Sequence, residues 1–116
     1  MVALSVDALF DAAAKIQLEE EKALPLVFSE AGISIRFPTT RRLADYLRVP
    51  HYYVLPFFAV MEQEALVTRA ERVGILTTDA GSRKLFRLIR DRYREPAEAI
   101  LGPALFEEIS RSIFRS

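Results

Sequence analysis

The sequence contains no cysteine and only one histidine, His51. The lack of cysteine excludes a disulfide framework, a thiolate zinc site, an iron–sulfur cluster and a cysteine nucleophile. With one histidine, no two-histidine metal motif is possible, and a Ser-His-Asp arrangement would depend on a single residue. We therefore expect no catalytic residues, no metal site, no cofactor and no enzymatic activity. The absence of cysteine also fits a reducing, cytoplasmic location.

Long apolar runs are also lacking. The longest, such as Tyr52 to Met61, are about half as long as a bilayer span requires. The N-terminus has no basic start followed by an apolar block, so no secretory signal is expected. At 116 residues, with 51% hydrophobic and 28% charged residues, the chain is predicted to form a single globular domain.

The sequence has no excess of positive or negative charge, and its formal net charge is +0. The charges are nevertheless uneven: residues 70–95 are basic, whereas residues 1–38 and 96–116 are acidic. A neutral chain is not drawn to polyanions by its total charge, so nucleic-acid binding would require a local basic face. Arginine greatly outnumbers lysine, which suits bidentate contacts to phosphate or carboxylate, although a GC-rich genome produces the same bias.

The N-terminal segment predicts two helices. Ser5 can cap a helix over residues 6–22. The acidic run Glu19–Glu21 near its end is interpreted as a solvated face. A second, short apolar helix is expected over residues 24–28, ending at Gly32, a residue suited to the left-handed position after a helix.

The middle of the chain predicts strands alternating with helices. Residues 33–37 alternate apolar and polar side chains, which predicts one short half-buried strand before Pro38. Thr39 or Thr40 can cap a two-turn helix that ends near Arg48. After a turn of about three residues, a second helix runs to about Glu64.

Pro56 leaves the start of this second helix open. If the helix begins at Pro50, Pro56 lies in its second turn and removes a backbone hydrogen bond. If it begins near Leu55, Pro56 takes the tolerated first position. Phe57 and Phe58 are expected in the core in either case.

Two short strands, 66–69 and 73–77, are close enough for a tight hairpin, and with 33–37 they could form a three-stranded sheet. Thr77 or Thr78 can cap the next helix, which runs to about Arg94 before Pro96 interrupts it. A last helical segment, with a Gly102–Pro103 break, ends the chain. Four arginines of the long helix share one outer face, which is either solvated or a surface for phosphate or an acidic partner: Arg83, Arg87, Arg90 and Arg94.

This order of elements resembles a winged helix-turn-helix, and short motifs support the resemblance. The segment Leu43-Ala44-Asp45-Tyr46-Leu47-Arg48-Val49 looks like the LAxxLxV helix and turn of bacterial winged-helix repressors. The segment 64–69 is similar to their entry into the wing, and Leu76-Thr77-Thr78-Asp79-Ala80-Gly81 is similar to the LTxxG that follows the wing in MarR-like regulators. The expected fold class is mainly α with a small antiparallel sheet, a winged helix-turn-helix with N- and C-terminal helical extensions.

The resemblance implies one domain, 1–116, with N-terminal helices (1–31), the winged helix-turn-helix core (32–80) and C-terminal helices (81–116). It further implies a DNA-binding transcription regulator that binds double-stranded DNA as a homodimer through its flanking helices. The implied groove-facing residues are His51, Tyr52, Tyr53 and Leu55. The implied backbone contacts are Thr39, Thr40, Arg41 and Arg42 at the supporting helix and Arg69 and Arg72 in the wing.

The recognition helix departs from the family pattern. Base readout uses side chains such as Arg, Lys, Gln or Asn, whereas this helix offers His51, Tyr52, Tyr53 and Leu55. The alternative is therefore a winged-helix protein–protein interaction module without sequence-specific DNA binding. A positive band across 39–42, 51–53 and 69–72 would favour DNA, and an apolar patch would favour protein.

Overall fold

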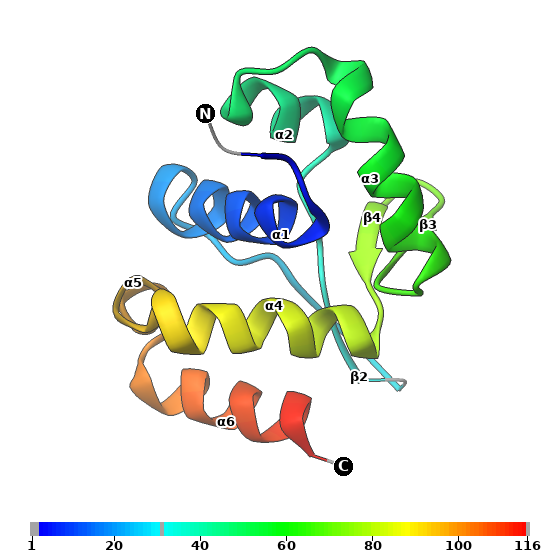
Figure 1. Cartoon of the computed structure of the whole chain (residues 1–116). Helices are drawn as coiled ribbons and strands as arrows, with labels where there is room; N and C mark the ends of the chain where they lie inside the picture. The colour runs from blue at the N-terminus through cyan, green and yellow to red at the C-terminus, as the bar shows by residue number, and fades with distance from the viewer. Residues whose placement is uncertain (1–2, 31, 116) are drawn as a thin grey trace.

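The computed structural model describes residues 3–30 and 32–115, which form helices and two small antiparallel sheets (Figure 1). In chain order the elements are α1 (Val6–Lys15), the π-helical turn η1 (Ile16–Glu20), β1 (Leu26–Ser29), β2 (Gly32–Ile35), α2 (Thr40–Leu47), α3 (His51–Gln63), β3 (Val67–Ala70), β4 (Gly74–Thr77), α4 (Asp79–Arg92), α5 (Arg94–Leu101) and α6 (Pro103–Phe114). The mainly helical class with small antiparallel sheets is thus confirmed. No helix among these residues is long and apolar enough to cross a bilayer.

The first predicted helix is confirmed, with its last turn widened. The Ser5 hydroxyl accepts a hydrogen bond from the N–H of Ala8 at 3.0 Å and caps α1. The helix then continues as η1 and ends at Glu20. The apolar side of this helix, including Leu9 and Phe10, is fully buried.

The second predicted helix, over residues 24–28, is wrong. The segment instead forms β1, which pairs antiparallel with β2 in the register Leu26↔Ile35 to Ser29↔Gly32. Short apolar runs do not distinguish a strand from a helix by periodicity alone, and Val27 and Phe28 are residues that strands favour. Gly32, expected to end a helix, is the first residue of β2, with a φ of 130°.

Helices α2 and α3 form a helical hairpin. Thr39 caps α2 by accepting a hydrogen bond from the N–H of Arg42 at 3.0 Å, and α2 ends at Arg48 in the left-handed conformation, with a φ of 59°. Helix α3 begins at His51, so the alternative start near Leu55 is wrong and Pro56 lies inside the helix. Pro56 is exposed, where the missing backbone hydrogen bond is least costly.

The predicted hairpin of β3 and β4 is confirmed, with register Val67↔Thr77 to Ala70↔Gly74. The expected three-stranded sheet is wrong, because β2 pairs with β1 and the chain after β2 meets β4 only at the single bridge Arg36↔Leu76.

Side-chain hydrogen bonds also connect β2 to the β3–β4 hairpin. The Thr77 hydroxyl accepts a hydrogen bond from the N–H of Ile35 at 2.8 Å and lies 2.7 Å from the Ser82 hydroxyl, which donates to the Ile33 carbonyl at 2.9 Å. These polar contacts join β2, β4 and α4.

The close approach between α4 and the start of the hairpin explains the glycine of the LTxxG motif. Thr78 caps α4, and a Cβ placed on Gly81 would lie 1.8 Å from the Leu66 carbonyl oxygen. Glycine is therefore needed at this position because the hairpin backbone crosses the helix there.

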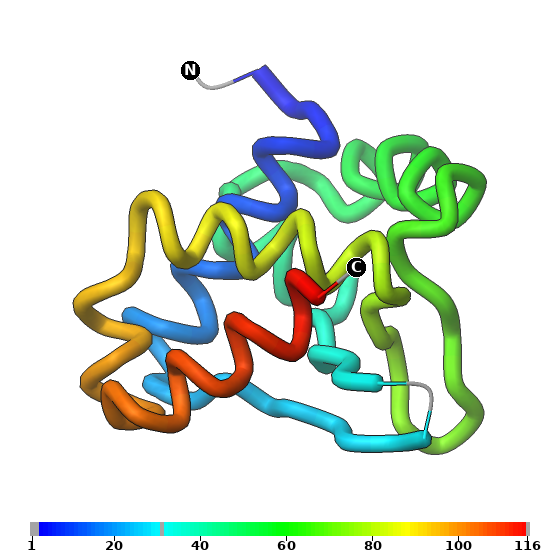
Figure 2. The backbone as a smooth tube through the Cα atoms, turned by 90° about the horizontal axis from the view of Figure 1, so that it is seen from below, coloured from blue at the N-terminus to red at the C-terminus, as the bar shows by residue number. Residues whose placement is uncertain are grey.

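Helices α4, α5 and α6 form the layer at the bottom of Figure 1, with α4 and α6 side by side and antiparallel in both views (Figure 2). Helix α4 ends two residues before the predicted Arg94, and the predicted Gly102–Pro103 break separates α5 from α6. The apolar residues of the flanking helices, Leu9, Phe10 and Ile16 in the N-terminal helix and Phe106 and Ile109 in α6, are buried within the single chain.

Candidate interaction surface

The threonines expected to meet phosphate are engaged in local hydrogen bonds. Thr39 caps α2. The Thr40 hydroxyl lies 2.7 Å from Nε2 of His51, so the start of α2 is joined to the start of α3. His51 is half-buried in this contact. The structure therefore brings Thr40 and His51 together as a link between the two helices.

Arg42 forms ion pairs within the chain. Its guanidinium donates a hydrogen bond to Glu20, and its Nε lies 3.8 Å from Glu21. The hydrogen bond to Glu20 raises the pKa of Arg42 above its ordinary value. The acidic run is solvated as expected, because Glu19, Glu20 and Glu21 are all exposed. Glu20 and Glu21 in addition offset the charge of Arg42.

Arg69 is also paired. Its Nε donates to the Glu62 carboxylate at 3.0 Å, and its guanidinium carbon lies 5.0 Å from the ring centre of the buried Phe58. Both contacts attach the β3–β4 hairpin to α3. This arginine is exposed, yet its charge is balanced by a neighbouring carboxylate.

Three other arginines on this side of the molecule are exposed: Arg41, Arg48 and Arg72. Within residues 3–30 and 32–115, none of them lies within ion-pairing distance of a carboxylate. They come from the start of α2, the turn between α2 and α3, and the tip of the β3–β4 hairpin.

The outer surface of α3 is apolar and uncharged. Its exposed large side chains are Tyr52 (65% exposed), Tyr53 (49%), Leu55 (42%) and Val60 (37%). Pro56 and Ala59 are exposed between them. We call these six residues the α3 face. The prediction for the core is confirmed for Phe58, which is buried, whereas Phe57 is half-buried.

The two tyrosines of the α3 face pack against each other edge to face, with ring centres 4.8 Å apart and an interplanar angle of 85°. Tyr53 also borders a groove of about 580 Å³ between α1 and the turn that precedes α3. Most of the residues that line this groove are apolar, including Ala8, Leu47 and Val49. Lys15 in the lining is paired with Asp11 at 3.5 Å, so Arg48 is the charged lining residue without a carboxylate partner among the described residues. The apolar surface thus continues from α3 into a concave site.

Sequence reasoning named Tyr52, Tyr53 and Leu55 but missed Pro56, Ala59 and Val60. A signal for them exists. The run from Tyr52 to Met61 has no charged residue, whereas a surface helix normally buries one apolar stripe and exposes a polar one. A helix with apolar residues on all sides must leave some of them uncovered unless it is buried.

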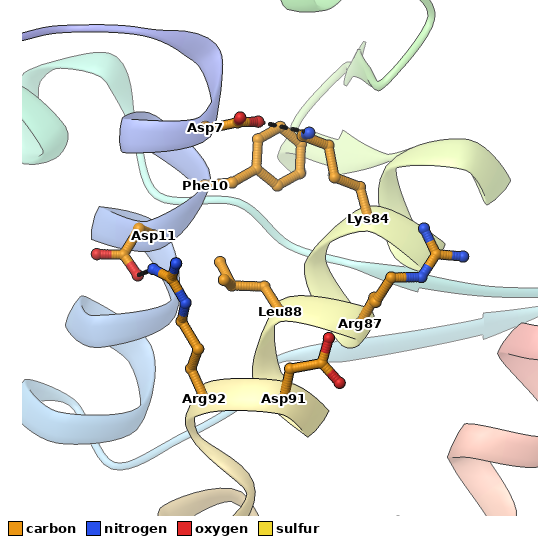
Figure 3. A pocket seen from close by; sticks show the side chains of 8 residues that line it. All are labelled: Asp7, Phe10, Asp11, Lys84, Arg87, Leu88, Asp91 and Arg92. Carbon is orange, nitrogen blue, oxygen red and sulfur yellow. Dashed lines mark hydrogen bonds and ion pairs between the residues drawn. The ribbon is translucent and has the colours of Figure 1, made fainter.

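A groove of about 330 Å³ between α1 and α4 is bridged by ion pairs (Figure 3). The Lys84 ammonium lies 2.6 Å from the Asp7 carboxylate and 5.5 Å from the ring centre of Phe10. Arg92 lies 3.6 Å from Asp11. These contacts attach α1 to α4 and offset the charges of Asp7, Asp11, Lys84 and Arg92, whereas Arg87, which also lines the groove, has no carboxylate partner among the described residues.

In the described part of the chain no group of three or more His, Asp and Glu side chains is placed to hold a metal ion. Comparisons with protein-family models, with curated proteins and with solved structures found no match to this chain.

Proposed function

We propose that the chain is a protein-interaction module of winged helix-turn-helix type and that the α3 face binds a segment of another protein. The observation that carries this proposal is the uncharged, apolar and exposed α3 face. In a DNA-binding winged helix the corresponding helix would present hydrogen-bonding side chains to base edges. Exposed apolar patches of this kind, with aromatic residues, are typical of protein interfaces.

The occupant that fits the α3 face is a short amphipathic helix. The α3 face spans the nine residues from Tyr52 to Val60, so it is about 13 Å long, which matches two to three turns of a partner helix. Since a tyrosine carries about 150–250 Å² of contact area, the exposed parts of Tyr52 and Tyr53 supply roughly 200 Å². The whole face is then smaller than the roughly 800 Å² per partner of a standard interface between two folded proteins.

The surroundings of the α3 face further define this partner. The groove beside Tyr53 can accept one apolar anchor side chain, as in other helix-in-groove complexes. Because Arg48 lines the groove without a carboxylate partner among the described residues, whereas Lys15 is paired with Asp11, an acidic residue placed beside Arg48 would be favoured. We therefore expect a partner helix with leucine or aromatic anchors and flanking aspartate or glutamate.

A displayed library of random 16-residue peptides, selected on the wild-type protein, tests the proposal. Selected peptides should carry apolar anchors with acidic flanks, and Tyr52→Glu should weaken their binding at least 10-fold. The matched control is Phe28→Glu, because Phe28 is also 65% exposed but lies on β1. Equal binding to wild type and Tyr52→Glu, or equal loss in Phe28→Glu, would refute a docking site on α3.

A DNA-binding regulator is the second candidate, and the exposed arginines Arg41, Arg48 and Arg72 favour it. The start of α2 also presents backbone N–H groups that favour a phosphate. Such a regulator would bind duplex DNA as a homodimer. Sedimentation at a mass of two chains, with sequence-selective binding that Arg41→Ala weakens, would support this function in place of peptide docking.

A further inference from the structure

A row of arginines follows the line along which α4 and α6 pack together: Arg83 borders a pocket with Ser112 and Ile113 of α6, and Arg87 and Arg90 contact Phe114 of α6. Arg83, Arg87 and Arg90 lie on α4, Arg94 begins α5, and Arg111 lies on α6. We call these five residues the arginine seam. Arg90, Arg94 and Arg111 border one shallow pocket. The seam lies in the α4–α6 layer at the bottom of Figure 1, whereas α3 lies at the top right.

Two aromatic rings hold the guanidinium groups of the seam. The guanidinium carbons of Arg87 and Arg90 lie 5.7 and 4.5 Å from the ring centre of Phe114, and that of Arg94 lies 5.1 Å from the ring centre of Phe106. Contact with a ring restricts the long arginine side chain. The ring contacts therefore restrain Arg87, Arg90 and Arg94, and an anion that binds these three has less side-chain freedom to remove.

The positive charge of the seam is only partly offset. Arg94 pairs with Glu98 at 2.6 Å and with Glu107 at 3.5 Å, and Arg90 lies 3.6 Å from Asp91. Arg83, Arg87 and Arg111 are exposed, and no carboxylate in residues 3–30 and 32–115 pairs with them. Near α3, Arg42 and Arg69 are compensated, whereas Arg41, Arg48 and Arg72 are, like the three seam arginines, exposed and without a carboxylate partner among the described residues.

We propose that the arginine seam binds the sugar–phosphate backbone of a nucleic-acid duplex without reading its sequence. The row from Arg83 to Arg94 is about 16 Å long, and over that length one strand of a duplex carries about five phosphates. Each guanidinium can donate two parallel hydrogen bonds to one phosphate. The three uncompensated arginines supply the charge that attracts the backbone.

The surface chemistry favours a phosphate backbone over an acidic protein. Protein interfaces have an apolar centre, whereas none of the exposed large apolar residues among those described lies on the seam. Phe114 is half-buried beside Arg87 and Arg90. The surface of the seam is therefore polar, with five guanidinium groups against the three carboxylates of Asp91, Glu98 and Glu107, and its net positive charge suits a ligand whose binding energy comes from charge.

Fluorescence anisotropy with a labelled 20-base-pair duplex of random sequence tests this proposal. Replacing Arg83, Arg87 and Arg111 together by glutamine should weaken binding at least 10-fold. The wild-type slope of log affinity against log salt should be about −3, from about −0.9 for each neutralised phosphate, and it should approach zero in the variant. The matched control replaces Arg41, Arg48 and Arg72 by glutamine, which removes the same charge and should leave affinity and slope nearly unchanged.

Several outcomes would overturn the proposal: no duplex binding at 50 mM salt, equal loss in the two triple variants, or polyglutamate of equal charge binding the seam as tightly as the duplex. If the glutamine variant fails to fold, as judged by circular dichroism, the lysine triple variant replaces it. Lysine keeps the charge but not the planar pair of donors. The lysine variant should therefore keep the salt slope and lose affinity, and unchanged affinity would contradict recognition by guanidinium groups.

Discussion

Replacing Thr77 by valine is expected to destabilise the fold by about 1–3 kcal/mol, the cost of a buried hydrogen-bonding group left without a partner. Thr77 is buried, and valine has nearly the same shape. Because the Ser82 proton is directed at the Ile33 carbonyl, the proton between the two hydroxyl groups must come from Thr77. Valine therefore leaves the N–H of Ile35 without its acceptor and removes the donor to Ser82.

A double-mutant cycle sharpens this prediction. Ser82→Ala alone leaves the Ile33 carbonyl and the Thr77 hydroxyl proton without partners, so it should also cost about 1–3 kcal/mol. In the double variant the Thr77 hydroxyl is absent, and its unsatisfied proton no longer contributes. The loss of stability in the double variant should therefore be smaller than the sum of the two single losses, by at least about 0.5 kcal/mol.

Urea unfolding of the four proteins measures these energies, with the slope of free energy against urea unchanged if the folded and unfolded states keep their compactness. For a domain of this size each kcal/mol lowers Tm by about 4 °C, which gives an independent check. Losses that add within about 0.3 kcal/mol would refute the chain of hydrogen bonds through Thr77 and Ser82.

Three further predictions concern single positions. Gly81→Ala should destabilise the fold by about 1–3 kcal/mol or more, because the new Cβ would meet the Leu66 carbonyl oxygen at 1.8 Å; an unchanged urea midpoint would contradict this. Arg48→Gly should stabilise it by about 0.5–1 kcal/mol, because Arg48 holds a left-handed φ of 59°; a lower Tm would argue against that strain. Burial, and then the hydrogen bond to Asp11, raise the pKa of Tyr93 well above its ordinary value. The neutral Tyr93 side chain therefore stabilises the fold fully below about pH 10, and this stabilisation is lost as the pH rises further. The phenolate absorbance of wild type and Tyr93→Phe should differ only well above pH 10, and a difference centred at about pH 10 would contradict the shift.

Local signals predicted those elements whose ends are marked by specific residues. Thr39 and Thr78 cap helices through their own hydroxyl groups, and Gly102 followed by Pro103 ends α5 and begins α6. Such signals act within three or four residues, so they can be read without knowing the fold. The β3–β4 hairpin belongs to the same group, because its two strands are separated by only three residues.

Elements that depend on distant partners could not be predicted in this way. The segment 26–29 forms a strand because β2 pairs with it, and its composition alone fits either structure. Arg42 and Glu20 are 22 positions apart in the sequence. Whether Arg42 is paired or free to bind phosphate therefore depends on how α2 packs against the N-terminal helix. The wider turn η1 likewise has no signal in the residues Ile16–Glu20 that we can identify.

The arginine row was predicted as one outer face of a helix, with its partner left open. The sequence pattern places Arg83, Arg87 and Arg90 on the same side of α4 because they are spaced by four and three residues. Their contacts with Phe114 could not be predicted, because that ring is supplied by α6 from the other end of the C-terminal segment.

Pro56 gives the α3 face a directional feature that its apolar side chains lack. Since proline has no N–H, the Tyr52 carbonyl oxygen cannot receive the usual helical bond from residue 56. This acceptor lies near the N-terminal end of the otherwise apolar α3 face. A bound peptide with a serine, asparagine or lysine at one position would donate a hydrogen bond to that oxygen, and this single bond would fix the register of the peptide along α3.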